Sequence, residues 1–94
     1  MTYNETRKAT KELVNTLEGF KKRTKHIAKI DADYYEGFVR VDIYAPKPNG
    51  KVFNEMLDYL NNTLALDNKT ERNEFFCNYE DDLEIEVCVY HWAR

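Results

Sequence analysis

The chain of 94 residues contains few of the residues that usually mark a functional motif, with three glycines, two prolines and two cysteines. There is no glycine-rich phosphate loop, no CxxC pair and no HxxxH pair. No window approaches the roughly 20 apolar residues of a membrane span, and charge interrupts the apolar run that a signal peptide needs near its start. These absences argue against a phosphate loop, a zinc site and a membrane protein, and they predict a cytoplasmic protein.

What the sequence does contain is typical of one small ordered domain spanning residues 1–94. Hydrophobic residues make up 43%, charged residues 33% and aromatic residues 14% of the chain. The charges are unevenly distributed, because residues 1–30 hold eight Lys or Arg and three Glu, whereas residues 31–94 hold fourteen acids and six bases. Such polarity bears on the choice of partners, because summed charge steers encounters between molecules.

Two segments have the apolar spacing of amphipathic helices. The first is predicted over residues 5–22 and begins with the capping-box pattern Thr2-x-x-Glu5. The second is predicted over residues 51–66, after Asn49-Gly50.

Two further segments alternate apolar and polar residues and predict β-hairpins. The first hairpin turns at Tyr-Glu-Gly and continues through residues 38–45, and the second covers roughly residues 71–79 and 83–92. The order α-β-β-α-β-β gives two αββ units. We expect an α+β fold, a circularly permuted ferredoxin-like sandwich in which both helices cover one face of a four-stranded antiparallel sheet. In that arrangement strands 38–45 and 83–92 lie in the centre.

The cysteines and histidines do not form a recognisable catalytic or metal-binding pattern. Strand alternation predicts that Cys77 and His91 point inward and Cys88 outward, so neither a disulfide between the cysteines nor a Cys88–His91 pair is expected. His26 lies among basic residues and is expected to be a surface cation. We therefore predict no catalytic residue, no metal ligand and no cofactor, and a protein that is not an enzyme.

The outward face of the predicted sheet combines acidic and aromatic side chains. Exposed aromatic residues are typical of protein interfaces, and carboxylates around them would match a basic partner surface. The predicted partner-binding residues are Asp31, Asp33, Asp42, Tyr44, Glu80, Asp81, Asp82, Glu84, Glu86, Tyr90 and Trp92.

These features predict a small non-enzymatic protein-binding module that docks on a basic protein surface, such as the nucleic-acid-binding site of a host enzyme. Carboxylates spaced along a strand can stand in for phosphates. Small size, acidic clustering and a composition rich in Asn, Lys and Tyr suit a phage or mobile-element inhibitor of the nucleic-acid-mimic kind, including anti-CRISPR-type proteins.

Two alternatives remain open at this point. The first is a nucleic-acid-binding protein that uses the basic first helix and the cluster Lys21, Lys22, Arg23, Lys25 and Lys29, since each cation that neutralises a phosphate releases a counterion. The second is a homodimer that buries the acidic aromatic face against its own copy.

Overall fold

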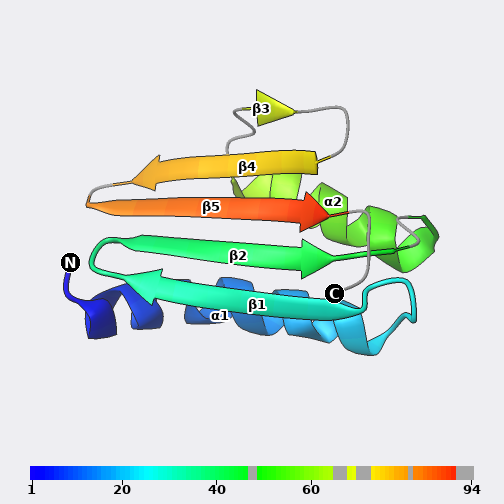
Figure 1. The fold of residues 1–94 in the computed structure, drawn as a ribbon, viewed down its shortest axis with the longest axis horizontal. Coiled ribbons are helices and arrows are strands. Elements are labelled where there is room, and N and C mark those ends of the chain that lie inside the picture. Colours follow the sequence, from blue (N-terminus) through cyan, green and yellow to red (C-terminus); the bar gives the residue numbers. More distant parts are fainter. Residues whose placement is uncertain (47–48, 65–67, 70–72, 81, 91–94) are drawn as a thin grey trace.

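The computed structural model is an α+β fold of two helices and one β-sheet (Figure 1). It describes residues 1–46, 49–64, 68–69, 73–80 and 82–90, of which 68–69 and 73–80 are described by their backbone. The elements in chain order are α1 (Tyr3–Lys22), β1 (Lys29–Tyr35), β2 (Phe38–Tyr44), α2 (Lys51–Thr63), β3 (Asn68–Lys69), β4 (Asn73–Glu80) and β5 (Leu83–Tyr90). No described helix is both long and apolar enough to cross a bilayer.

Helix α1 begins with the predicted capping box. The backbone N–H of Thr2 donates to the Glu5 carboxylate at 3.0 Å, and the backbone N–H of Glu5 donates to the Thr2 hydroxyl at 3.2 Å. The first of these hydrogen bonds lowers the pKa of Glu5, because it favours the charged form of the carboxylate. The reciprocal bonds satisfy donors that a helix start would otherwise leave free.

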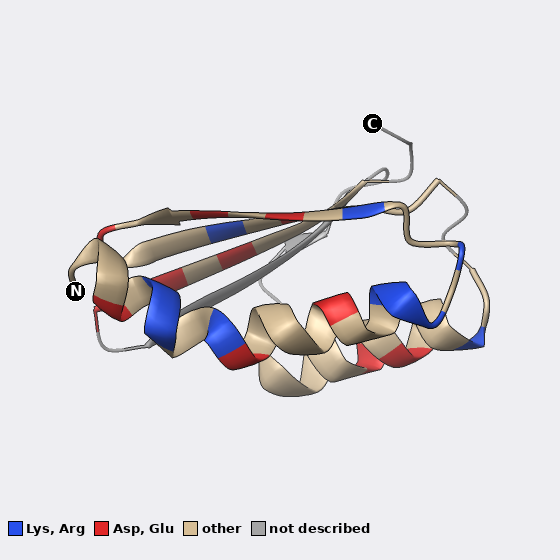
Figure 2. Cartoon of the chain, turned by 90° about the horizontal axis from the view of Figure 1, so that it is seen from below, with Lys and Arg blue, Asp and Glu red and all other residues tan. Residues whose placement is uncertain are grey.

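Both helices lie on one side of the sheet, as the sequence predicts (Figure 2). The apolar side chains of β2 and β5 pack against those of α1 and α2, and together they form the hydrophobic core between the sheet and the helices. The fully buried members of this core are Leu17, Val39, Val41, Ile43, Ala45, Met56, Leu60, Val87 and Val89. The opposite face of the sheet is left without a helix, and we call it the open face.

The sheet differs from the predicted four-stranded antiparallel one. Strands β1, β2 and β5 form a mixed sheet, because β1 and β2 pair antiparallel whereas β2 and β5 pair parallel. Beyond β5 the sheet continues through β4 and β3, which gives the order β1-β2-β5-β4-β3. The central placement of β2 and β5 is confirmed, but their parallel direction contradicts the permuted ferredoxin-like arrangement, which requires antiparallel neighbours throughout.

An additional strand explains the change of direction. Strand β3 pairs antiparallel with β4, so the chain makes one more pass between α2 and the second hairpin than the sequence predicts. That extra pass reverses the direction in which the β4–β5 hairpin enters the sheet, and β5 consequently runs parallel to β2 (Figure 1). A two-residue polar strand has no alternating pattern, so it gives no signal in the sequence.

Candidate functional site

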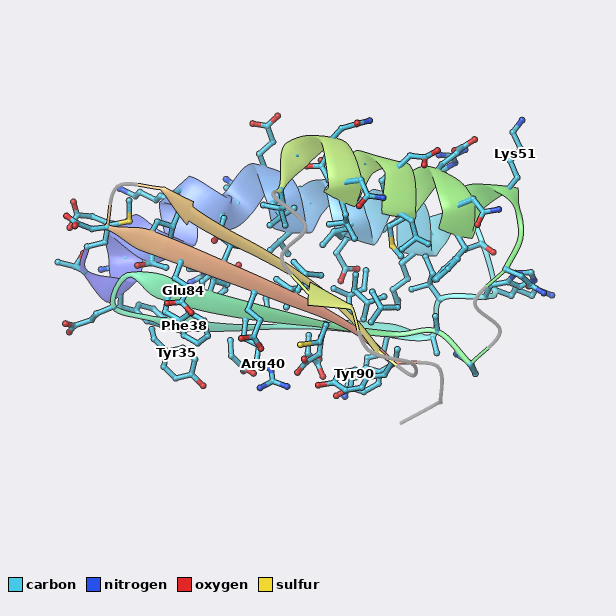
Figure 3. The ribbon with its side chains drawn as sticks, turned by 90° about the horizontal axis from the view of Figure 1, so that it is seen from above. Tyr35, Phe38, Arg40, Lys51, Glu84 and Tyr90 are labelled. Carbon is cyan, nitrogen blue, oxygen red and sulfur yellow. The ribbon has the colours of Figure 1, made fainter. Side chains whose placement is uncertain are left out.

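Side chains on the open face fall into cross-strand rows, because opposed residues of neighbouring strands share a face. The row nearest the hairpin turns runs Tyr35, Phe38, Glu84, and the next runs Asp33, Arg40, Glu86. The remaining rows are Asp31, Asp42, Cys88 and Lys29, Tyr44, Tyr90. Figure 3 shows Tyr35, Phe38, Arg40, Glu84 and Tyr90 on the side of the sheet away from the helices.

One end of this face is a closed polar network centred on Arg40. The guanidinium donates from Nε to Asp42 Oδ1 at 3.1 Å and from Nη2 to the Tyr90 hydroxyl at 2.6 Å. Its Nη1 atom also lies 3.8 Å from Glu86 Oε1. The hydrogen bond to Asp42 raises the pKa of Arg40, so the charge of this group is fixed. We call Arg40, Asp42, Glu86, Cys88 and Tyr90 the Arg40 network.

Cys88 is part of this network and is not exposed. Its side chain is fully buried, and its thiol donates to Glu86 Oε1 at 3.4 Å. Burial raises the pKa of Cys88 to about 12, and the neighbouring Glu86 carboxylate adds to the shift. Because the thiolate is the reactive form of cysteine, a thiol held neutral in this way is a poor nucleophile.

A stacked tyrosine pair closes the same end of the face. The rings of Tyr44 and Tyr90 lie 5.1 Å apart with an interplanar angle of 16°. Tyr44 is only 7% exposed, which differs from the exposed position predicted for it. Burial raises the pKa of Tyr90, whose hydroxyl accepts the hydrogen bond from Arg40.

The other end of the face is formed where the two hairpin turns meet. Gly37 has a φ of +78°, a conformation that other residues rarely adopt. A Cβ atom at this position would lie 2.7 Å from the Asp82 carbonyl oxygen, so the backbones of the two turns are in direct contact. The Glu84 N–H donates to the Gly37 carbonyl at 2.8 Å, and the Gly37 N–H donates to the buried Thr6 hydroxyl of α1 at 2.8 Å.

These contacts gather aromatic and acidic side chains at one place, which we call the hairpin tip: Tyr35, Glu36, Phe38, Asp82 and Glu84. The rings of Tyr35 and Phe38 stack at 5.5 Å, and Tyr35 remains 52% exposed. Within the described part of the chain, none of the three tip carboxylates forms a salt bridge. The tip therefore presents carboxylates that pair with no described cation, beside an aromatic pair in which Tyr35 is exposed and Phe38 is half-buried.

The structure divides the predicted partner-binding residues between these two ends. Asp82 and Glu84 belong to the tip, whereas Asp42, Glu86 and Tyr90 belong to the Arg40 network. At the edge of the sheet, Asp31 pairs with Lys29 at 3.3 Å, and Asp33 lies opposite Arg40 without a salt bridge to any described residue. Asp81, Trp92 and the side chain of Glu80 are outside the described residues, as are His91 and the side chain of Cys77.

The cations predicted for nucleic-acid binding do not form one free patch. Arg23 pairs with Glu55 of α2 at 2.9 Å, and Lys29 is held by Asp31. Lys21, Lys22 and Lys25 remain without a salt bridge among the described residues. Two of the five expected phosphate contacts are therefore already engaged with carboxylates.

His26 joins two loops. Its Nδ1 atom is hydrogen-bonded to the Asn49 carbonyl, in the segment that leads into α2. A Cβ atom on the adjacent Gly50 would lie 2.9 Å from the same Nδ1. These contacts are structural, and among the described residues no group of three or more His, Cys, Asp or Glu could hold a metal ion.

Tyr35 and Glu36 are site residues that sequence reasoning missed, because the sequence indicates only a turn at this position. The signal that could have identified them is the pairing of two acidic hairpin turns, Tyr-Glu-Gly and Glu-Asp-Asp. That signal is readable only once the inner strands of both hairpins are known to be neighbours.

A scan against protein-family models finds no matching family, and searches of curated proteins and of solved structures find no significant match.

Proposed function

We propose that the protein is a non-enzymatic binding module whose hairpin tip docks on a basic protein surface. The observation that carries this proposal is the stacked Tyr35–Phe38 pair beside the carboxylates of Glu36, Asp82 and Glu84, none of which is neutralised by a described cation. Interface centres are enriched in aromatic residues, and charge complementarity steers the approach of a partner.

The Arg40 network serves a different purpose in this proposal. Its carboxylates already have a cation, so Asp42 and Glu86 would add little attraction for a basic partner. Arg40 instead connects β2 to Glu86 and Tyr90 of β5 and gives the tip a rigid support, which lowers the entropic cost of binding. The contact is thus made by the tip, flanked by Asp33.

The nature of the charge favours one class of partner. Carboxylates concentrated at adjoining turns imitate closely spaced phosphates, and nucleic-acid-processing enzymes carry extended basic surfaces that recognise phosphates. We propose that the module occupies such a site and blocks it, which makes it an inhibitor of the nucleic-acid-mimic kind.

A quantitative pull-down tests this proposal. Wild type is compared with a tip variant (Glu36→Gln, Asp82→Asn, Glu84→Gln) and a control variant (Glu12→Gln, Glu18→Gln, Asp58→Asn), using a nuclease-treated bacterial lysate and mass spectrometry. The control neutralises the same number of carboxylates on the helical layer, so it separates the position of the charge from the net charge. Each recovered protein is then purified and titrated directly, with a nucleic-acid duplex as competitor.

We expect wild type and control to bind a basic nucleic-acid enzyme in competition with the duplex, and the tip variant to bind at least about tenfold more weakly. Equal binding by the tip variant would overturn the proposal. Recovery of no partner, together with a concentration-dependent dimer that Tyr35→Asp abolishes, would assign the tip to self-association. Direct binding of nucleic acid that is lost in a Lys21, Lys22, Lys25 to Gln variant would assign the chain to the alternative class.

A further inference from the structure

A second charged region lies between α1 and the sheet edge and has the opposite sign. Helix α1 and the edge strand β1 enclose an open groove of about 520 Å³, whose helical wall carries Arg7, Lys8 and Lys11 and whose strand wall carries Tyr34. The apolar base includes Val14, which packs on the hydrophobic core. This region is separate from the hairpin tip and from the cluster at residues 21–29.

The charges of the three groove cations are only partly offset by a neighbouring acid, Glu12, which follows Lys8 by one helical turn. None of them forms a salt bridge within the described ranges, although the protein contains more acids than bases. Arg7 and Lys11 are four residues apart on one helix, a spacing at which like charges repel and destabilise the helix. Glu5, the nearest acid before them, is engaged in the capping box. An anion in the groove would relieve this repulsion.

From this geometry we infer that the groove binds a phosphate-bearing small molecule of nucleotide size. Three cations around one space match a group with two or more negative charges, which a phosphate carries and a single carboxylate does not. The planar guanidinium of Arg7 suits two-point contact with phosphate oxygens, and lysines supply compact point charges. Tyr34 offers an aromatic surface on the opposite wall, and the volume lies in the range of small-molecule pockets, about 300–1,000 Å³.

The edge position of β1 supports the same assignment. No described strand or helix covers the outer side of β1, so a ligand reaches the groove without displacing an element of the fold. Tyr3 packs edge-to-face against Tyr34 at 6.2 Å and is 46% exposed, so a second aromatic ring borders the groove. Rings at this position could contact a planar base while the cations hold its phosphates.

NMR titration of the ¹⁵N-labelled full chain with ADP tests this inference, with pyrophosphate and adenosine titrated separately. The groove variant is Arg7→Gln/Lys11→Gln, and the matched control is Lys21→Gln/Lys22→Gln, which removes the same charge from the other end of α1. Both pairs are at the helix surface, and the dispersion of each spectrum shows whether the variant folds.

We expect ADP to give saturable shifts at the amides of residues 4–15 and 34, pyrophosphate to affect the α1 residues of that set, and adenosine to affect none. The groove variant should weaken ADP binding at least about tenfold and the control less than about twofold.

No shift at about 10 mM ADP, equal losses in the two variants, or equal binding of adenosine would overturn the inference. So would tighter, steeply salt-dependent binding of a single-stranded oligonucleotide, or equal binding of a glutamate-rich peptide, each of which would name a different ligand class. The tip variant should bind ADP as wild type does, so this inference and the docking proposal can fail independently.

Discussion

The two ends of the open sheet face use the same residue types for opposite purposes. In the Arg40 network, aromatic and acidic side chains satisfy one another around a single cation, and Cys88 is fully buried among them. At the hairpin tip, aromatic and acidic side chains lie together without a described cation, and Tyr35 remains exposed. Composition alone does not distinguish the two ends, whereas the presence of one arginine does. This contrast supports the proposal that the first end stabilises the sheet and the second contacts a partner.

The largest effect is expected from breaking the contact that forms the tip. Gly37→Ala combines a positive φ with a clash against the backbone of Asp82, and it should lower the free energy of unfolding by about 2–4 kcal/mol. Urea denaturation measures the change. The matched control is Gly19→Ala, because nothing lies within 4 Å of its added Cβ and the helix should gain up to about 1 kcal/mol. Unchanged stability in Gly37→Ala would show that the two turns are not locked together.

A somewhat smaller loss is expected from opening the Arg40 network. Arg40→Leu leaves Asp42, whose side chain is 14% exposed, and the Tyr90 hydroxyl without their arginine, and should cost about 1–3 kcal/mol of unfolding free energy.

The comparison variant for this change is Arg23→Leu, which removes a more exposed pair with Glu55. That pair should be worth less than about 1 kcal/mol. Equal costs for the two arginines would contradict the structural role of the network.

The pH dependence of stability sharpens the same distinction. The folded protein holds the Cys88 thiol at a pKa of about 12, whereas an unfolded chain loses this proton near the ordinary thiol pKa. The contribution of Cys88 is therefore fully present below about pH 9 and is lost as the pH rises towards 12, by up to about 1.4 kcal/mol per unit. Unfolding free energies of wild type should fall more steeply over this range than those of Cys88→Ser, which keeps a donor for Glu86 but does not titrate there. Parallel curves would show that Cys88 is not held as described.

Local sequence patterns were sufficient to predict most of the elements. The capping box and apolar spacing of residues 5–22 predict α1, and strict alternation predicts β2 and β5 as strands. Their central placement was expected from the ferredoxin-like arrangement, and it is confirmed although their direction is not. The apolar spacing of residues 5–22 also counts Ala9 among the inward residues, and this part of the pattern is wrong. Ala9 is exposed, whereas Thr6 and Thr10 are buried, because their hydroxyls donate to helix carbonyls at 2.9 Å and Thr6 also receives the Gly37 N–H. A buried threonine can donate its hydroxyl to a backbone carbonyl of the same helix. A hydrophobicity pattern does not register this hydrogen bond and therefore predicts that the threonine lies at the surface.

The site was less predictable than the elements, because it depends on which strands are neighbours. The sequence correctly places Asp42, Glu84, Glu86 and Tyr90 on one face, but it gives no indication that Arg40 pairs with two of the three carboxylates. Nor could it bring Gly37 to Asp82, since that contact depends on the parallel pairing of β2 and β5, which a two-residue strand determines.

The most direct test of the contrast between the two ends is the unfolding free energy of the tip variant (Glu36→Gln, Asp82→Asn, Glu84→Gln) at low and high salt. If the tip carboxylates repel one another and are retained for a partner, neutralising them should raise stability by a few tenths of a kcal/mol at low ionic strength. That gain should disappear at about 1 M salt, where the Debye length is about 3 Å. A loss of stability at both salt concentrations would show that the tip carboxylates hold the fold together as the Arg40 network does, and would contradict the division of the open face.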